Sequence, residues 1–140
     1  MNNENLKQRT RAFALDVIHL VEKLPRDMVN EVLGKQLLRS GTSVAANYRS
    51  AARAKSSANF IAKMSLVEEE ADESVLWADL LEASSRVNTL STQPLIKEAG
   101  ELTAIAVASI RTARRTASES KTSARSPSGP HSALRAPRLP

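Results

Sequence analysis

Apolar side chains recur at intervals of three and four residues along most of the chain, the spacing of helices with one buried face. A first helix is predicted over about residues 4–24, ending at Pro25, and a second over about residues 27–54. The apolar stripe of the first contains Leu6, Phe13, Val17, Leu20 and Leu24, and that of the second contains Leu33, Leu37, Gly41, Val44 and Tyr48. Both stripes are wide enough to face a shared core.

Two further helices complete the pattern. The third is predicted over about residues 57–87 and repeats Phe60, Met64, Val67, Ala71, Ala78 and Leu81; the fourth begins near Thr92, with Pro94 in its first turn. No segment alternates as a strand does, and the connections around Pro25, Lys55 and Leu90 are short. The predicted fold is therefore all-α: an antiparallel, up-down-up-down four-helix bundle over residues 1–118.

Residues 119–140 differ in composition from the rest. They contain four of the six prolines, many Ser and Arg residues and no apolar period, so we predict a disordered C-terminal tail. Four Lys or Arg residues against one Glu give this tail most of the net charge of +5.

Targeting and redox signals are few. The chain has no Cys, no signal-peptide pattern at its N-terminus and no apolar run of membrane-spanning length. We therefore expect a cytoplasmic protein with no membrane partner.

The second predicted helix has a cationic face. At 100° per residue, Lys35, Arg39, Arg49 and Arg53 fall within an arc of roughly 80°, opposite the apolar stripe. No Asp or Glu occurs between Glu31 and Glu68, whereas the third helix is rich in both. Two interpretations stay open: the cations form salt bridges with the acidic helix or another subunit, or they contact phosphates.

Catalytic chemistry finds little support. Asp16 and His19 have a spacing of three, but a carboxylate-bridged metal pair would need a second such motif. Glu69 and Glu73 lack a nearby nucleophile or a glycine-rich phosphate loop. We expect no enzyme activity, no cofactor and no metal.

Residues Gln36 to Ala83 resemble the bacterial four-helix-bundle family named after proteins encoded in intervening sequences of 23S ribosomal RNA genes. The likeness is carried by Gln36-Leu37-Leu38-Arg39, Ser43-Val44 with Asn47, Arg53-Ala54-Lys55-Ser56, Phe60 with Lys63-Met64, and Glu70-Ala71-Asp72-Glu73 with Trp77. This resemblance implies a homopentamer around a central channel, without known catalytic activity.

One branch of that family serves as the accessory variability protein of diversity-generating retroelements, in which a basic barrel is thought to bind nucleic acid and the reverse transcriptase. By this resemblance Arg39, Arg49, Arg53 and Lys55 are candidate contacts to RNA or DNA, and Lys35 joins them on the cationic face. The alternative is an assembly or protein-interaction scaffold without nucleic-acid contact.

Overall fold

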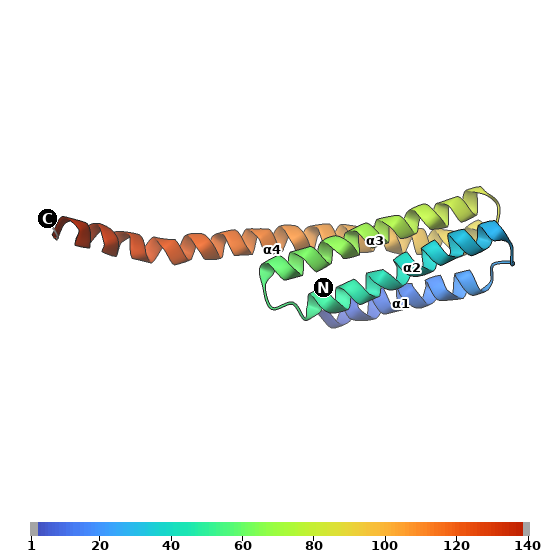
Figure 1. Ribbon diagram of the computed structural model, residues 1–140, viewed down its shortest axis with the longest axis horizontal. Coiled ribbons are helices and arrows are strands. Elements are labelled where there is room, and N and C mark those ends of the chain that lie inside the picture. Colours follow the sequence, from blue (N-terminus) through green and yellow to red (C-terminus); the bar gives the residue numbers. More distant parts are fainter. Residues whose placement is uncertain (1–2, 139–140) are drawn as a thin grey trace.

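The computed structural model describes the backbone of residues 3–138 and the side chains of residues 4–123. It contains four helices: α1 (Asn3–Glu22), α2 (Met28–Ala52), α3 (Ser57–Ala83) and α4 (Thr89–Arg138). Consecutive helices run antiparallel and pack side by side, and α4 continues past the end of the bundle where α2 joins α3 (Figure 1). The predicted up-down-up-down four-helix bundle is confirmed.

Side-chain caps set where α2 and α3 begin. The Asp27 carboxylate accepts a hydrogen bond from the backbone N–H of Asn30 at 2.8 Å, and the Ser56 hydroxyl accepts one from Asn59 at 3.1 Å. Each bond satisfies one of the backbone donors that a first helical turn leaves without a partner. The two short connections expected near Pro25 and Lys55 therefore end at well-defined caps.

The connection between α3 and α4 differs from the prediction. Helix α3 stops at Ala83, four residues early, because Ser85 adopts a left-handed conformation with φ 60°. The next N–H groups then turn back: Ser85 donates to the Glu82 carbonyl and Arg86 to the Leu81 carbonyl. Helix α4 starts at Thr89, three residues earlier than expected, directly after Asn88, whose side-chain oxygen accepts from Leu90 N–H at 2.6 Å.

The apolar stripes meet in one core. Its fully buried side chains come from all four helices and include Phe13, Val17, Leu37, Val44, Met64, Leu81 and Leu102. Helix α1 packs closely on α2 and only loosely on α4, and an ion pair bridges the looser seam. There Arg9 Nε lies 2.9 Å from Glu98 Oε2. Most positions that the periodicity selected are buried, whereas Leu24, Leu33 and Phe60 are half-buried against the core.

The backbone of α4 is helical through residues 119–138 of the predicted tail, and side chains are described there only to residue 123. The disorder of residues 119–140 stays a prediction. Residues 119–123 are helical and exposed. Within residues 3–138, no helix has both the length and the apolar character needed to cross a bilayer.

Candidate nucleic-acid interface

The five cations predicted as nucleic-acid contacts are all exposed, but they lie apart along the bundle. Lys35 and Arg53 are 18 residues apart, which in a helix is about 27 Å. By their positions along the chain, Arg49, Arg53 and Lys55 lie at the end where α2 joins α3, Arg39 is midway along α2, and Lys35 is toward its other end. The structure therefore divides the predicted stripe into three parts.

Arg39 is held by the acidic face of α3. Its guanidinium donates to Glu70 Oε2 at 2.9 Å and forms a second, shorter contact with Glu73 Oε1. Glu73 also accepts a hydrogen bond from Trp77 Nε1 at 3.1 Å. Burial raises the pKa of Glu73, but the hydrogen bonds from Trp77 and Arg39 outweigh it, and the net pKa is lowered. The cross-helix salt bridge that the charge pattern allowed is thus present at Arg39.

Helix α4 adds cations that the sequence argument did not select. Arg111, Arg114 and Arg115 are exposed and occupy a stretch of α4 with no acid from residue 102 to residue 118. At the other end of the seam, Glu82 of α3 accepts a hydrogen bond from Gln93 of α4 at 2.9 Å. Because α3 and α4 are antiparallel, this register places the first turns of α3 beside roughly residues 110–118 of α4.

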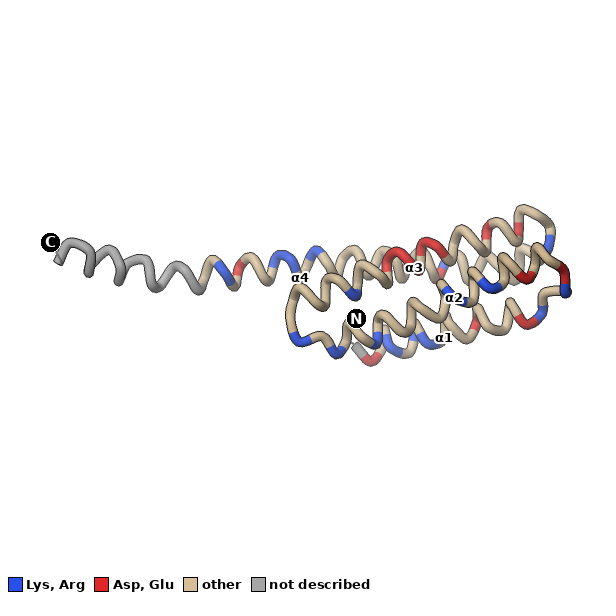
Figure 2. The backbone as a smooth tube through the Cα atoms, viewed as in Figure 1, with Lys and Arg blue, Asp and Glu red and all other residues tan. Residues whose placement is uncertain are grey.

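Two acid-free stretches consequently lie together at one end of the bundle. We call this surface the basic end and define it by seven residues: Arg49, Arg53, Lys55, Lys63, Arg111, Arg114 and Arg115. Six of them are exposed, Lys63 is half-buried, and none forms an ion pair with another residue among those described. Figure 2 shows Lys and Arg residues in blue along α4 where it leaves the bundle.

The backbone adds to the positive potential there. Helix α3 begins at this end, and its first N–H groups and macrodipole carry partial positive charge. Arg11 and Lys7 on the first half of α1 are also exposed and make no ion pair with any residue that the structure describes. Five of the seven side chains of the basic end are arginines, whose planar donors suit phosphate oxygens. The arrangement can hold a polyanion.

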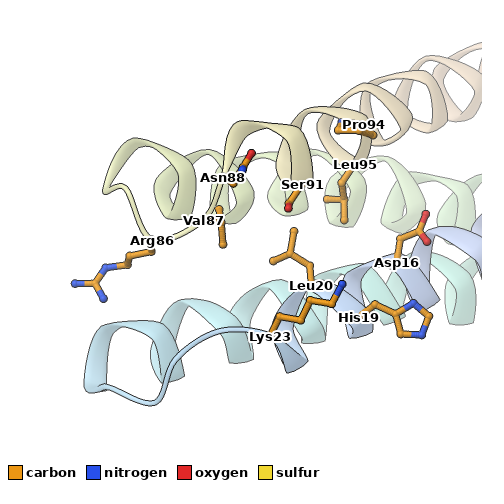
Figure 3. Close-up of a pocket in the computed structure, with 10 residues that line it drawn as sticks. All are labelled: Asp16, His19, Leu20, Lys23, Arg86, Val87, Asn88, Ser91, Pro94 and Leu95. Atoms are coloured by element: carbon orange, nitrogen blue, oxygen red, sulfur yellow. The ribbon is translucent and has the colours of Figure 1, made fainter.

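The opposite end of the bundle has mixed charge. A cavity of about 480 Å³ lies between α1 and the start of α4. Figure 3 shows Asp16 and His19 of α1, with Lys23 just after it, on one side and Ser91 of α4 on the other. Arg86 borders it too, but its guanidinium bonds Asp27 at 3.0 Å.

Metal-binding potential is low in the part of the chain that the structure describes. No three His, Asp or Glu side chains there lie close enough together to share a metal ion. Asp16 and His19 line the cavity without a third ligand among the described residues.

A signal for the missed arginines was present in the sequence. The segment Ile110 to Ala117 contains three arginines and, like the stretch after Glu31, no acidic residue. Because it continues an apolar repeat, its arginines look like the ordinary exposed residues of an amphipathic helix. Only the antiparallel register of α3 and α4 brings these two stretches together.

Comparisons with protein families and with solved structures both find similar proteins. Residues 2–108 match the family described as 23S rRNA-intervening sequence protein. A protein of unknown function from the S23 ribosomal protein family of Bacteroides thetaiotaomicron has a crystal structure with a TM-score of 0.70 to this chain. It is 30% identical, and the match covers 79% of this chain and 99% of that one. No curated protein matches.

Proposed function

The chain belongs to the 23S rRNA-intervening sequence protein family, and from this premise we propose that it is a non-enzymatic protein that binds the phosphate backbone of RNA or DNA through its basic end. The observation that carries the proposal is the convergence of seven cations from α2, α3, α4 and a connecting loop. Each is free of ion pairs with the described residues. Arg39 is not among them, because two carboxylates share its charge.

The expected binding is electrostatic and sensitive to salt. A site that neutralises Z phosphates of duplex DNA shows a slope of log affinity against log salt of about −0.9Z. Seven cations on one chain give weak to moderate affinity, and an assembly that displays several basic ends multiplies it. We expect such a homo-oligomer, a pentamer by family resemblance, to act in the cytoplasm, as an accessory factor to a nucleic-acid enzyme such as a reverse transcriptase.

Charge neutralisation with a matched control tests this proposal. One variant combines Arg53→Gln, Arg111→Gln and Arg115→Gln at the basic end. The control combines Lys35→Gln, Arg39→Gln and Lys97→Gln, which removes the same charge elsewhere. Fluorescence anisotropy of a labelled RNA hairpin and a DNA duplex, titrated over a salt series, measures affinity and slope.

We expect the first variant to weaken binding and to flatten the salt slope by up to three ionic contacts per chain, about 2.7 units. The control should keep most of the wild-type slope. Equal losses in both variants would mean that net charge, not the basic end, governs binding. Absence of binding by the wild-type chain would refute the proposal.

A second candidate function is an assembly or protein-interaction scaffold, favoured by exposed apolar side chains on α2 and α3. Val29, Val32, Leu76 and Leu80 are between 39% and 55% exposed, and they lie on adjacent helices in the half of the bundle away from the basic end. Exposed apolar groups gathered in one region are typical of interaction surfaces. Light scattering of Val32→Lys and Leu80→Lys variants tests this function, which predicts smaller assemblies with unchanged helicity.

A further inference from the structure

An apolar groove opens at the basic end. Its volume is about 470 Å³, and three large apolar side chains line it: Leu6 of α1, Phe60 of α3 and Ile105 of α4. The rest of its wall is formed by the small side chains of α4, Ala108, Ser109, Thr112 and Ala113. The groove therefore lies at the same end of the bundle as the basic end, between α1, the start of α3 and α4.

Phe60 gives the groove an aromatic wall. The ring is half-buried against the core, so one part is anchored while another part borders the groove. Trp77, the other aromatic residue of α3, is engaged elsewhere, because its indole N–H donates to Glu73. Phe60 is thus the aromatic side chain that the basic end offers to a ligand.

The groove also contains unused hydrogen-bonding groups. Among the described residues, neither the Ser109 nor the Thr112 hydroxyl makes a hydrogen bond. A hydroxyl can both donate and accept, so the pair can meet the edge of any base. On α4, Arg111 and Arg115 follow the groove residues Ala108 and Thr112 by one turn and so border the groove, whereas Arg114 lies on the far side of the helix. Lys7 follows Leu6 on α1.

An apolar groove with an aromatic wall, bordered by cations, suits one occupant best. Single-stranded nucleic acids expose unstacked bases beside a charged backbone, and proteins hold them by stacking bases on aromatic rings while cations follow the phosphates. A duplex keeps its bases paired and stacked, so it could use the cations but not the groove. We propose that the basic end prefers single-stranded RNA or DNA and that an unpaired base enters the groove and stacks on Phe60.

This inference rests on the proposed function, and the experiment separates the two. Full-length protein is titrated against a labelled single strand of about 16 nucleotides and against the corresponding duplex. A second strand with 2-aminopurine at internal positions reports base stacking through its fluorescence. The variants are Phe60→Ala, Phe60→Leu, which keeps an apolar side chain without the ring, and Leu66→Ala, a control at an exposed apolar position of the same helix.

We expect the wild-type chain to bind the single strand more tightly than the duplex and to change the 2-aminopurine signal. Both Phe60 variants should lose about 5- to 150-fold in single-strand affinity, the effect of removing one stacking platform, with duplex affinity unchanged. Leu66→Ala should behave as wild type.

Three results would overturn the inference. If single strand and duplex bind equally and the Phe60 variants match wild type, the groove takes no base, although the basic end still binds phosphates. If both Phe60 variants weaken duplex and single strand alike, the ring has only a structural role. If no nucleic acid binds the wild-type chain, the proposed function fails together with this inference.

Discussion

The Ser74 hydroxyl of α3 lies 2.9 Å from the Ser40 hydroxyl of α2, and both side chains are fully buried. Each also reaches a carbonyl of its own helix: Ser74 lies 2.8 Å from the Glu70 oxygen, and Ser40 lies 3.2 Å from the Leu37 oxygen. The two small residues let α2 and α3 approach closely, next to the Arg39 ion pairs. This polar contact is part of an otherwise apolar seam.

We predict that Ser40→Ala and Ser74→Ala each lower the free energy of unfolding by about 1 kcal/mol. The loss is no larger because the remaining serine hydroxyl still donates a hydrogen bond to a backbone carbonyl of its own helix. The double variant should lose about 0.5 kcal/mol less than the sum, since the shared hydrogen bond is removed only once. Urea denaturation of the four chains provides the measurement. Strict additivity would show that the two hydroxyls do not interact.

Gly41 and Gly100 should respond to alanine in opposite directions. A Cβ at Gly41 would lie 2.7 Å and 2.9 Å from the two methyl groups of Val17 on α1, whereas a Cβ at Gly100 meets nothing within 4 Å. We predict that Gly41→Ala destabilises by about 1–3 kcal/mol through overpacking. Gly100→Ala should stabilise by about 0.5–1 kcal/mol through better helix propensity.

Thermal unfolding followed by circular dichroism distinguishes these cases. Val17→Ala should destabilise the Gly41→Ala chain less than it destabilises the wild-type chain, because it removes the methyl groups that clash with the new Cβ. A stabilising Gly41→Ala would mean that α1 shifts freely on α2.

Ser85 is predicted to be a site of easy stabilisation. Ser85 adopts the left-handed backbone conformation just after the end of α3. Glycine adopts this conformation without the steric cost that a Cβ atom imposes. We expect Ser85→Gly to raise stability by about 0.5–1 kcal/mol, after allowance for the extra freedom of glycine in the unfolded chain. Ser84→Gly is the control, because Ser84 has φ −86° and its hydroxyl bonds the Leu80 carbonyl at 2.7 Å. A gain at Ser84 but not at Ser85 would contradict the explanation.

Stability should fall in acid through carboxylates at the end opposite the basic end. The hydrogen bond from Asn30 N–H, with Arg86 beside it, lowers the pKa of Asp27, and the Thr92 hydroxyl lowers the pKa of Glu82. A carboxyl whose pKa is lower in the folded state stabilises above its unfolded value and loses that contribution as the pH falls through the folded value. The unfolded values are 3.8 for Asp and 4.5 for Glu.

Urea midpoints measured from pH 6 to pH 3 should therefore be constant at first and then decline below about pH 4.5. Asp27→Asn and Glu82→Gln should each start lower and decline less steeply. A midpoint that rises as the pH falls would show that other groups dominate.

The presence of four helices and most of their core positions were determined by sequence alone, because helical periodicity depends on neighbours three or four residues away. The repeat of Phe13, Val17 and Leu20 on one face of α1, and the caps at Asp27 and Ser56, can be read locally. The early stop at Ser85 could not, since a serine in the left-handed conformation leaves no pattern. A cationic face on α2 was likewise evident from spacing.

Which charges meet was decided only by tertiary structure. The register between α2 and α3 brings Arg39 to Glu70 and Glu73, whereas that between α3 and α4 sets the acid-free start of α3 beside the arginines of α4. An exposed charged side chain changes the free energy of folding little at any surface position of a helix. The apolar repeat therefore does not reveal which charged residues will pair. The basic end and the groove beside Phe60 therefore arise from the packing of separate helices, which no single stretch of sequence encodes.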